Sequence, residues 1–279
     1  MAAEVTGIDH TGLAVEDLDA AAAFFRRLGF VLTPREALTR PGPDGTHVPS
    51  GADNHVFMLR RGYQEIIAIT DPDSGHMLIP RLGMYRGVHI VVLGTDDADG
   101  LRARLAADGV EVGPCMTWGR AVQGGGEARF RFFMYAPAAA PEAVLCAVQH
   151  LTPEVLRPEA LLHHPNGAEA LDGVTLHVAD PAEAEARYAR LLGRAPSAPG
   201  LFRFADGTWL RLADAAGLAR RFPGAALPPA PAVAALDFAL RDPDHVARAG
   251  VALHADDDGG HWIGPDDAFG AIIRLVPAH

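Results

Sequence analysis

The chain has 279 residues, with 24 Lys and Arg against 35 Asp and Glu, which gives a net charge of −11 at pH 7. This acidic balance disfavours binding to nucleic acid or to an anionic membrane surface, because both need an excess of basic side chains. Hydrophobic residues make up 49% of the chain, and no apolar run is long enough to cross a bilayer. The length and composition predict about two globular domains and no membrane partner.

Cysteine content and the first residues bear on the cellular compartment. The two cysteines, Cys115 and Cys146, exclude a disulfide framework and a Cys-rich zinc module. The segment Met1–Gly7 contains Glu4 and has no apolar stretch, so we expect no signal peptide. These features are typical of a protein of the reducing cytoplasm.

One pattern recurs along the chain: an alternating apolar run, an Asp, and a helix-like stretch that ends at a Gly. Alternation predicts a strand with one buried face, Asp is typical of a helix start, and Gly is typical of a helix end. The acids are Asp17, Asp96, Asp180 and Asp242, and the apolar runs before them are Gly7–Val15, Gly87–Leu93, Gly173–Val178 and Val233–Leu240.

Further short strand-like runs follow each predicted helix, so each unit is predicted to be β-α-β-β-β, and the chain an α+β protein of four such modules. Turn-forming Pro, Asn and Gly separate the second and third units, which predicts domains at 1–155 and 171–279 joined by a linker at 156–170. The predicted later strands are Phe30–Pro34, His55–Arg60 and Tyr63–Thr70; Val110–Trp118, Ala128–Tyr135 and Val144–Leu151; Leu201–Phe204 and Thr208–Leu212; and Val251–His254, His261–Gly264 and Ala271–Val276.

The segments Ile8–Asp19 and Phe24–Phe30 are similar to the opening motif of the vicinal oxygen chelate superfamily. That superfamily includes glyoxalase I, extradiol dioxygenases and bleomycin-resistance proteins. The segments Gln149–Glu154 and His164–Gly167 further resemble its glyoxalase-like branch. The resemblance covers nearly the whole chain and implies that the four modules pair into two half-open barrels.

The resemblance also implies a divalent metal inside a barrel, bound by residues of the first and last strand of each module. Its first-strand ligand stands seven residues before the acid that starts the helix. That position holds His10 and His89 in the first two units, and Gly173 and Ala235 in the last two. The resemblance therefore implies a metal site in the N-terminal domain and none in the C-terminal domain.

The last strands of the modules are expected to supply the remaining ligands. The first unit has Glu65, in an apolar run where an unpaired carboxylate would be costly to bury. The second unit has Gln149 and His150, of which alternation lets only one face the barrel, and we favour His150. The third and fourth units have Arg211 and Arg274, whose positive charges would repel a metal.

The set of His10, Glu65, His89 and His150 predicts a metal-dependent enzyme that chelates a small-molecule substrate through neighbouring oxygens. Glyoxalase-like isomerase or lyase chemistry is favoured, with His150 or Glu65 transferring the proton. Two alternatives stay open: an Fe(II)-dependent dioxygenase, and a binding protein that sequesters its ligand without catalysis. Such ligands suit Fe, Zn, Mn, Ni or Co, so the metal is not determined. The resemblance is also compatible with a homodimer.

Overall fold

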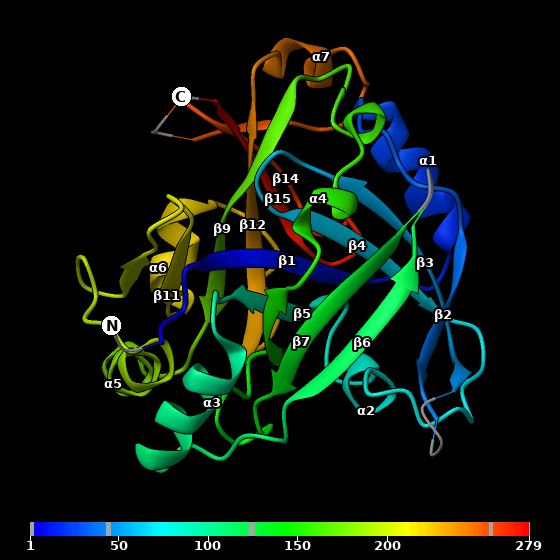
Figure 1. Cartoon of the computed structure of the whole chain (residues 1–279). Coiled ribbons are helices and arrows are strands. Elements are labelled where there is room, and N and C mark those ends of the chain that lie inside the picture. The colour runs from blue at the N-terminus through cyan, green and yellow to red at the C-terminus, as the bar shows by residue number, and fades with distance from the viewer. Residues whose placement is uncertain (1–2, 43–45, 123–125, 257–258, 279) are drawn as a thin grey trace.

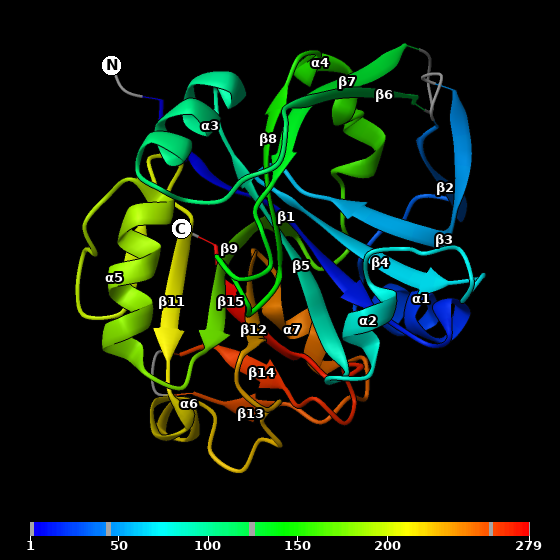
Figure 2. The ribbon, with the colours of Figure 1, turned by 90° about the horizontal axis from the view of Figure 1, so that it is seen from below.

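The computed structural model describes residues 3–42, 46–122, 126–256 and 259–278. Within these residues the fold consists of an eight-stranded sheet and a seven-stranded sheet, with helices beside them. Figure 2 shows the first sheet at the upper right and the second at the lower left. This α+β architecture of paired units confirms the predicted fold class. None of the helices in the described part of the chain has the length and apolar content needed to cross a membrane.

The first sheet comes from residues 7–150. Its elements are β1 (Gly7–Ala14), α1 (Leu18–Arg27), β2 (Glu36–Pro41), β3 (His47–Met58), β4 (Tyr63–Ile69), α2 (Ile79–Leu82), β5 (Gly87–Gly94), α3 (Ala98–Ala107), β6 (Met116–Ala121), β7 (Glu127–Met134) and β8 (Val144–His150). The strand order is β2-β3-β4-β1-β5-β8-β7-β6. The first strands of the two units, β1 and β5, pair antiparallel at the centre, and each runs parallel to the last strand of its own unit.

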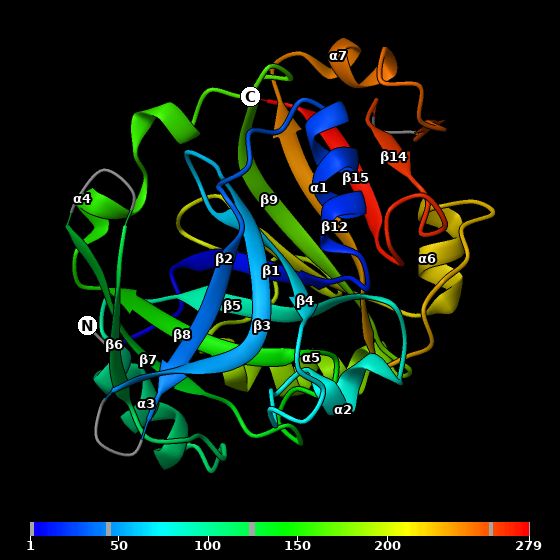
Figure 3. The same ribbon diagram turned by 90° about the vertical axis from the view of Figure 1, so that its right-hand side faces the viewer.

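This sheet curls into a nearly closed barrel, in which side chains join its two edge strands. Arg120 of β6 lies 3.7 Å from Glu36 of β2. The ring of Trp118 packs on that of His47, with centroids 3.9 Å apart. Figure 3 shows β2 and β3 on one side of the barrel and β6 and β7 on the other.

The second sheet is a shorter version of the same plan. After α4 (Pro153–Leu156) and a single helical turn at Glu159–Leu161, its elements are β9 (Ala168–His177), α5 (Pro181–Leu192), β10 (Leu201–Arg203), β11 (Trp209–Ala213), α6 (Ala215–Arg221), β12 (Ala232–Leu240), α7 (Pro243–Ala247), β13 (His254–Ala255), β14 (His261–Ile263) and β15 (Ile272–Pro277). The order is β10-β11-β9-β12-β15-β14-β13, with β9 and β12 antiparallel at the centre. The linker predicted at 156–170 lies largely between the two sheets; the division into domains stays a prediction.

Three predicted strands need correction. Residues Phe30–Pro34 form no strand, because the Phe30 backbone closes the end of α1 on Phe25 and its ring packs against Phe57 in the core. The other two overlap the observed strands only at their ends: Val110–Trp118 overlaps β6 only at Met116–Trp118, and Val251–His254 overlaps β13 only at His254.

The third unit has two strands after its helix, in the two ranges predicted for it, so the general β-α-β-β-β plan is one strand short there. Residues 193–208, all of which the structure describes, hold only β10 between α5 and β11.

The helix starts follow the predicted Asp positions with one shift. The side chains of Asp17 and Asp180 accept hydrogen bonds from backbone N–H groups in the first turns of α1 and α5. In the second unit this cap is Asp97, which bonds the Gly100 N–H, and not Asp96. The predicted ligand position of the second unit, which lies seven residues before the helix cap, therefore moves from His89 to Ile90.

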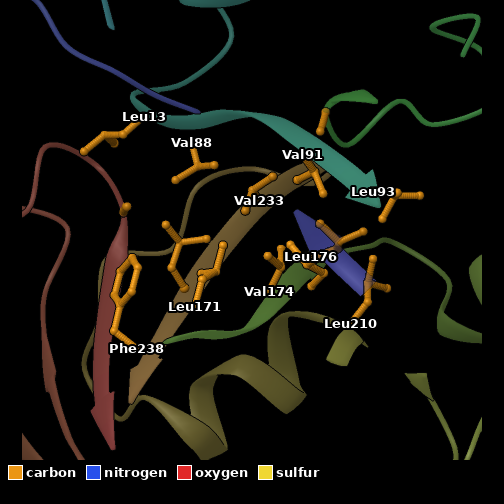
Figure 4. Packing of buried hydrophobic residues seen from close by; sticks show 14 of the residues in the cluster. Leu13, Val88, Val91, Leu93, Leu171, Val174, Leu176, Leu210, Val233 and Phe238 are labelled. Atoms are coloured by element: carbon orange, nitrogen blue, oxygen red, sulfur yellow. The ribbon is translucent and has the colours of Figure 1, made fainter. Parts of the chain in front are cut away.

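The two sheets share one hydrophobic core. Leu13 of β1 and Val91 of β5 pack toward Val174 of β9 and Val233 and Phe238 of β12, and all of these side chains are buried. Figure 4 shows this packing between the first strands of the units. Apolar packing thus buries the convex face of the central strands. The concave face of the first barrel stays available for a site.

A buried ion pair also joins the two halves. Glu142, which precedes β8 and is 1% exposed, accepts two hydrogen bonds from Arg187 of α5, at 2.7 and 3.1 Å. It accepts a third from the hydroxyl of Tyr188, at 2.9 Å. Arg187 also contacts Glu183, on the exposed side of the same helix.

We expect Glu142→Ala to lower the free energy of unfolding by about 3–5 kcal/mol, because it leaves the Arg187 guanidinium buried without its main partner. Glu183→Ala removes the other carboxylate from the same arginine, but at an exposed position, and should cost less than about 1 kcal/mol. Urea denaturation of both variants measures the difference. Equal losses in the two variants would contradict the assignment of Glu142 as the contact that joins the halves.

Candidate functional site

The concave face of the first sheet encloses a cavity of about 340 Å³, a size typical of small-ligand sites. Its polar side chains are His10, Asn54, Tyr63 and Glu65, with Glu36 and Arg120 among the residues from the two edge strands. Most of the remaining wall is apolar. The wall includes Val56, Ile90, Val92, Phe130, Phe132, Met134, Val144, Cys146 and Val148.

A β-bulge in β1 brings the Asp9 side chain into contact with His10, which lines this cavity. Ile8 and His10 pair with the adjacent residues Leu93 and Val92 of β5, so Asp9 is the extra residue of the bulge. Asp9 is buried and lies between two imidazoles. Nδ1 of His10 donates to its Oδ1 over 2.6 Å, and Nε2 of His150 donates to its Oδ2 over 2.7 Å.

These two hydrogen bonds fix the charge of Asp9. Burial opposes its ionisation, but the bonds and charges of His10 and His150 outweigh burial and hold the pKa of Asp9 well below its ordinary value. The carboxylate can only accept, so it fixes the proton of a neutral His10 on Nδ1 and leaves Nε2 as an acceptor, which the Tyr63 hydroxyl reaches at 3.3 Å.

Tyr63 of β4 holds the His10 ring from one side. The two rings stack with centroids 4.1 Å apart, and the Tyr63 hydroxyl lies 3.3 Å from Nε2 of His10. Burial, with the charges of Asp9 and Glu65, raises the pKa of Tyr63, so its hydroxyl stays protonated. The imidazole therefore has one defined orientation at the cavity wall.

Glu65 of β4 supplies a second proton-transfer group to the same cavity. The amide Nδ2 of Asn54, on the neighbouring strand β3, donates to Oε1 of Glu65 over 2.6 Å. The apolar run that singled out Glu65 in the sequence thus holds a carboxylate partnered by an amide. His10 and Glu65 are the two predicted site residues that the structure brings into one cavity.

His89 lies elsewhere. Gly12 and Leu13 pair with Ile90 and Val88, so His89 is the extra residue of a second bulge. Its ring lies in a separate hollow beside Tyr85, whose backbone oxygen accepts a hydrogen bond from Nε2 at 3.0 Å. The reason is the one-residue shift of the helix cap: the position seven residues before Asp97 is Ile90, which does line the cavity.

The strand ends of the second unit also differ from expectation. Gln149 bonds the backbone at Asp96 and Ala98, at the start of α3, and His150 bonds Asp9 instead of lining the cavity. In the register of the sheet, Gly12 pairs with Glu65 in the first unit, and Val92 with Cys146 in the second. Cys146 is thus the counterpart of Glu65.

A metal centre of the expected kind does not fit these residues. Where the first unit has His10 and Glu65, the second has Ile90 and Cys146, and the side chain of Ile90 cannot bind a metal. In the four described stretches of the chain, no group of three or more His, Cys, Asp or Glu side chains is placed to hold a metal ion. Metal binding by His10 and Glu65 stays a prediction.

The equivalent positions of the second barrel hold other side chains. Gly173 leaves room for the indole of Trp209, which a side chain there would meet. Arg211 pairs with Thr175, and Arg274 with Asp237, as Glu65 does with Gly12. The counterparts of His10 are Gly173 and Ala235, and those of Glu65 are Arg211 and Arg274. The absence of a metal site from this sheet stays a prediction.

The comparisons with known proteins agree with this fold. The sequence model of a glyoxalase-like domain matches residues 8–192, more than half of the chain. The chain belongs to the glyoxalase-like domain family. Its membership of the vicinal oxygen chelate superfamily, indicated by the opening motif, is thereby confirmed. No curated protein matches the chain in sequence.

Solved structures resemble the whole chain. A hypothetical protein from Staphylococcus aureus has a TM-score of 0.68 at 11% identity, over 98% of this chain and 100% of its own. A mutant of 4-hydroxymandelate synthase from Streptomyces coelicolor has a TM-score of 0.62 at 16% identity, over 98% and 92%. At these identities the likenesses show the fold alone. A methylmalonyl-CoA epimerase from Streptomyces coelicolor covers 53% of this chain, with a TM-score of 0.40 and 23% identity, over 99% of its own length.

Burial lowers the pKa of His89 from 6.5 to about 4, so the folded protein keeps this imidazole neutral where the unfolded chain binds a proton. The unfolded state then holds more protons, and the free energy of unfolding falls as the pH drops from 7 toward 4. We expect His89 to account for about 2–3 kcal/mol of this loss by pH 4.5. Urea denaturation of His89→Leu at pH 7 and 4.5 should show that part of the pH dependence removed.

His163→Leu is the matched control, because the His163 side chain is 65% exposed. It should keep the pH dependence of the wild-type protein. An unchanged pH dependence in His89→Leu would contradict the burial of a neutral imidazole at this position.

Proposed function

We propose that the cavity of the first barrel is the active site of an isomerase or lyase that moves a proton on a small, mainly apolar substrate. The observation that carries this proposal is the His10 imidazole, held by the buried Asp9 carboxylate and facing an apolar cavity that also contains Glu65. Two groups that exchange protons, on one cavity, suit removal and return of a proton next to a carbonyl.

Each side chain has a defined part in this proposal. Nε2 of His10 takes the proton in exchange for its hydrogen bond from the Tyr63 hydroxyl. Asp9 stabilises the imidazolium that forms, as a carboxylate does when it orients a catalytic histidine. Glu65, positioned by Asn54, lies on the strand next to that of His10 and exchanges a second proton with the substrate. The apolar wall excludes water, which strengthens these interactions. General acid–base catalysis of this kind contributes roughly 10²–10⁴-fold in rate.

The metal-dependent form of this chemistry has weaker support. A catalytic metal site typically needs three protein ligands around an open position. His10 and Glu65 supply two ligands, whereas Ile90 and Cys146 stand at the counterpart positions and His150 is bonded to Asp9. The same argument weighs against the Fe(II) dioxygenase, which needs a facial triad. We therefore assign proton transfer to the side chains themselves.

A ligand-sequestering protein is the second candidate. It is favoured by the largely apolar wall of the cavity. Such a protein would bind its ligand in this cavity and leave it unchanged. A full metal-ligand set in the cavity would weigh against it, and His89 lies in a separate hollow.

The test is deuterium uptake from D₂O by a panel of alkyl and aryl α-hydroxy ketones and hemithioacetals, followed by proton NMR. We expect uptake next to the carbonyl for at least one compound. His10→Asn and Glu65→Gln should lower its rate by about 10²–10⁴-fold, since each removes a proton-transfer group. Asp9→Asn should lower it as well, because an amide leaves the orientation of His10 undefined.

Glu159→Gln is the matched control, because this carboxylate is 63% exposed, contacts Arg60 and lies outside the cavity. It should change the rate by less than about threefold, and circular dichroism should show all variants folded. Uptake that survives in both His10→Asn and Glu65→Gln would contradict the proposal. Binding in the cavity without uptake would favour the sequestering protein.

A further inference from the structure

The second barrel contains a larger cavity, of about 630 Å³, which the proposed function does not use. It lies on the concave side of the second sheet, where β12 and β15 contribute Asp237 and Arg274 to its wall. Arg60 and Arg61, between β3 and β4, also line it. The first barrel thus supplies part of the wall of a cavity in the second.

Asp237 is the unusual group in this wall. It is fully buried, and its Oδ2 accepts hydrogen bonds from Arg274 at 2.7 Å and from Arg221 at 3.3 Å. No donor within the described ranges reaches its Oδ1. A buried oxygen without a hydrogen-bond partner destabilises the protein. A ligand that donates a hydrogen bond to this oxygen removes that cost and binds more tightly.

Arg61 offers the complementary group. Its guanidinium contacts Asp172 through Nη2 at 2.5 Å, while its Nε is buried and has no acceptor among the residues that the structure describes. Arg60, which donates to Glu159 at 3.0 Å, and Arg203 add guanidinium groups to the same wall. Among the described residues of this wall, four arginines exceed three carboxylates: Arg60, Arg61, Arg203 and Arg274 against Glu169, Asp172 and Asp237. Guanidinium groups bind carboxylates strongly, so this side of the cavity favours an anion.

Two observations narrow the ligand class further. The ligand group that donates to Asp237 should be a neutral hydroxyl rather than an ammonium, because Arg221 and Arg274 already place positive charge beside that carboxylate. Trp209 adds a flat apolar surface, with its indole over Gly173. The same positive charges make a metal cation an unsuitable occupant.

We propose that this cavity is a second binding site, for a small hydroxy acid. The hydroxyl of the ligand donates to Oδ1 of Asp237, and a carboxylate accepts from Nε of Arg61 and from the neighbouring arginines. This site is independent of the chemistry proposed for the first barrel.

The test is isothermal titration calorimetry of the full chain with L-malate and with succinate, which lacks only the hydroxyl. We expect L-malate to bind at least fivefold more tightly than succinate, since only malate can donate to Asp237. Equal affinities of the two acids, or no binding of malate at millimolar concentrations, would overturn the proposal.

Variants locate the site. Arg61→Gln should weaken malate binding at least fivefold, and Ala239→Leu, which fills the cavity, should abolish it. Arg26→Gln, an exposed arginine on α1, is the charge-matched control and should bind malate as the wild-type protein does. Unchanged affinity in both Arg61→Gln and Ala239→Leu would place the malate elsewhere and contradict the site.

A further comparison separates this site from the first barrel. His10→Asn and Glu65→Gln should bind malate with unchanged affinity. If they lose malate binding while Arg61→Gln keeps it, the ligand lies in the first barrel and the second site is refuted. Failure of the deuterium-uptake test alone would leave the malate result standing.

Discussion

The buried carboxylate of Asp9 between two imidazoles is the contact on which the candidate site depends. A carboxylate is costly to bury unless charged or polar partners surround it, and here His10 and His150 both donate to it. Because His150 belongs to β8 and Asp9 to β1, the same contact ties the two units of the first barrel together. It also fixes the tautomer of His10, so the stability of the barrel and the orientation of its base share one cause.

The internal repeat shows how one backbone plan carries different chemistry. Corresponding strand positions hold His10 and Glu65 in the first unit, and Ile90 and Cys146 in the second. In the third and fourth units, arginines replace the carboxylate. The fold supplies positions that face a concave surface, and the side chains at those positions decide what each barrel can bind. One barrel thus offers proton-transfer groups in an apolar wall, and the other offers guanidinium groups around a buried carboxylate.

Most of the fold can be predicted from the sequence, because alternation and helix caps are local signals. Asp17 and Asp180 both cap the predicted helices, and all four first strands form as expected. The adjacent acids Asp96 and Asp97 are equally good caps by composition. Counting seven residues back from Asp96 gives His89, whereas counting from the actual cap, Asp97, gives Ile90. A β-bulge cannot be predicted from the apolar pattern of one strand, since its extra residue is defined by the pairing with a distant strand.

For the same reason Asp9 was not among the predicted site residues, although an acid inside an apolar strand is a signal of its own. Its two partners come from its neighbour in the chain and from a strand far along it. The sequence therefore identifies His10 and Glu65, and the structure adds the carboxylate that orients His10.

Elemental analysis of the protein purified without chelator tests most directly the claim that His10 and Glu65 act without a metal centre. The placement of the donors predicts well under one equivalent of Fe, Zn, Mn, Ni or Co per chain, with no difference between wild type and His10→Asn. One equivalent of a metal per chain that disappears in His10→Asn would contradict the account and restore the metal-dependent chemistry.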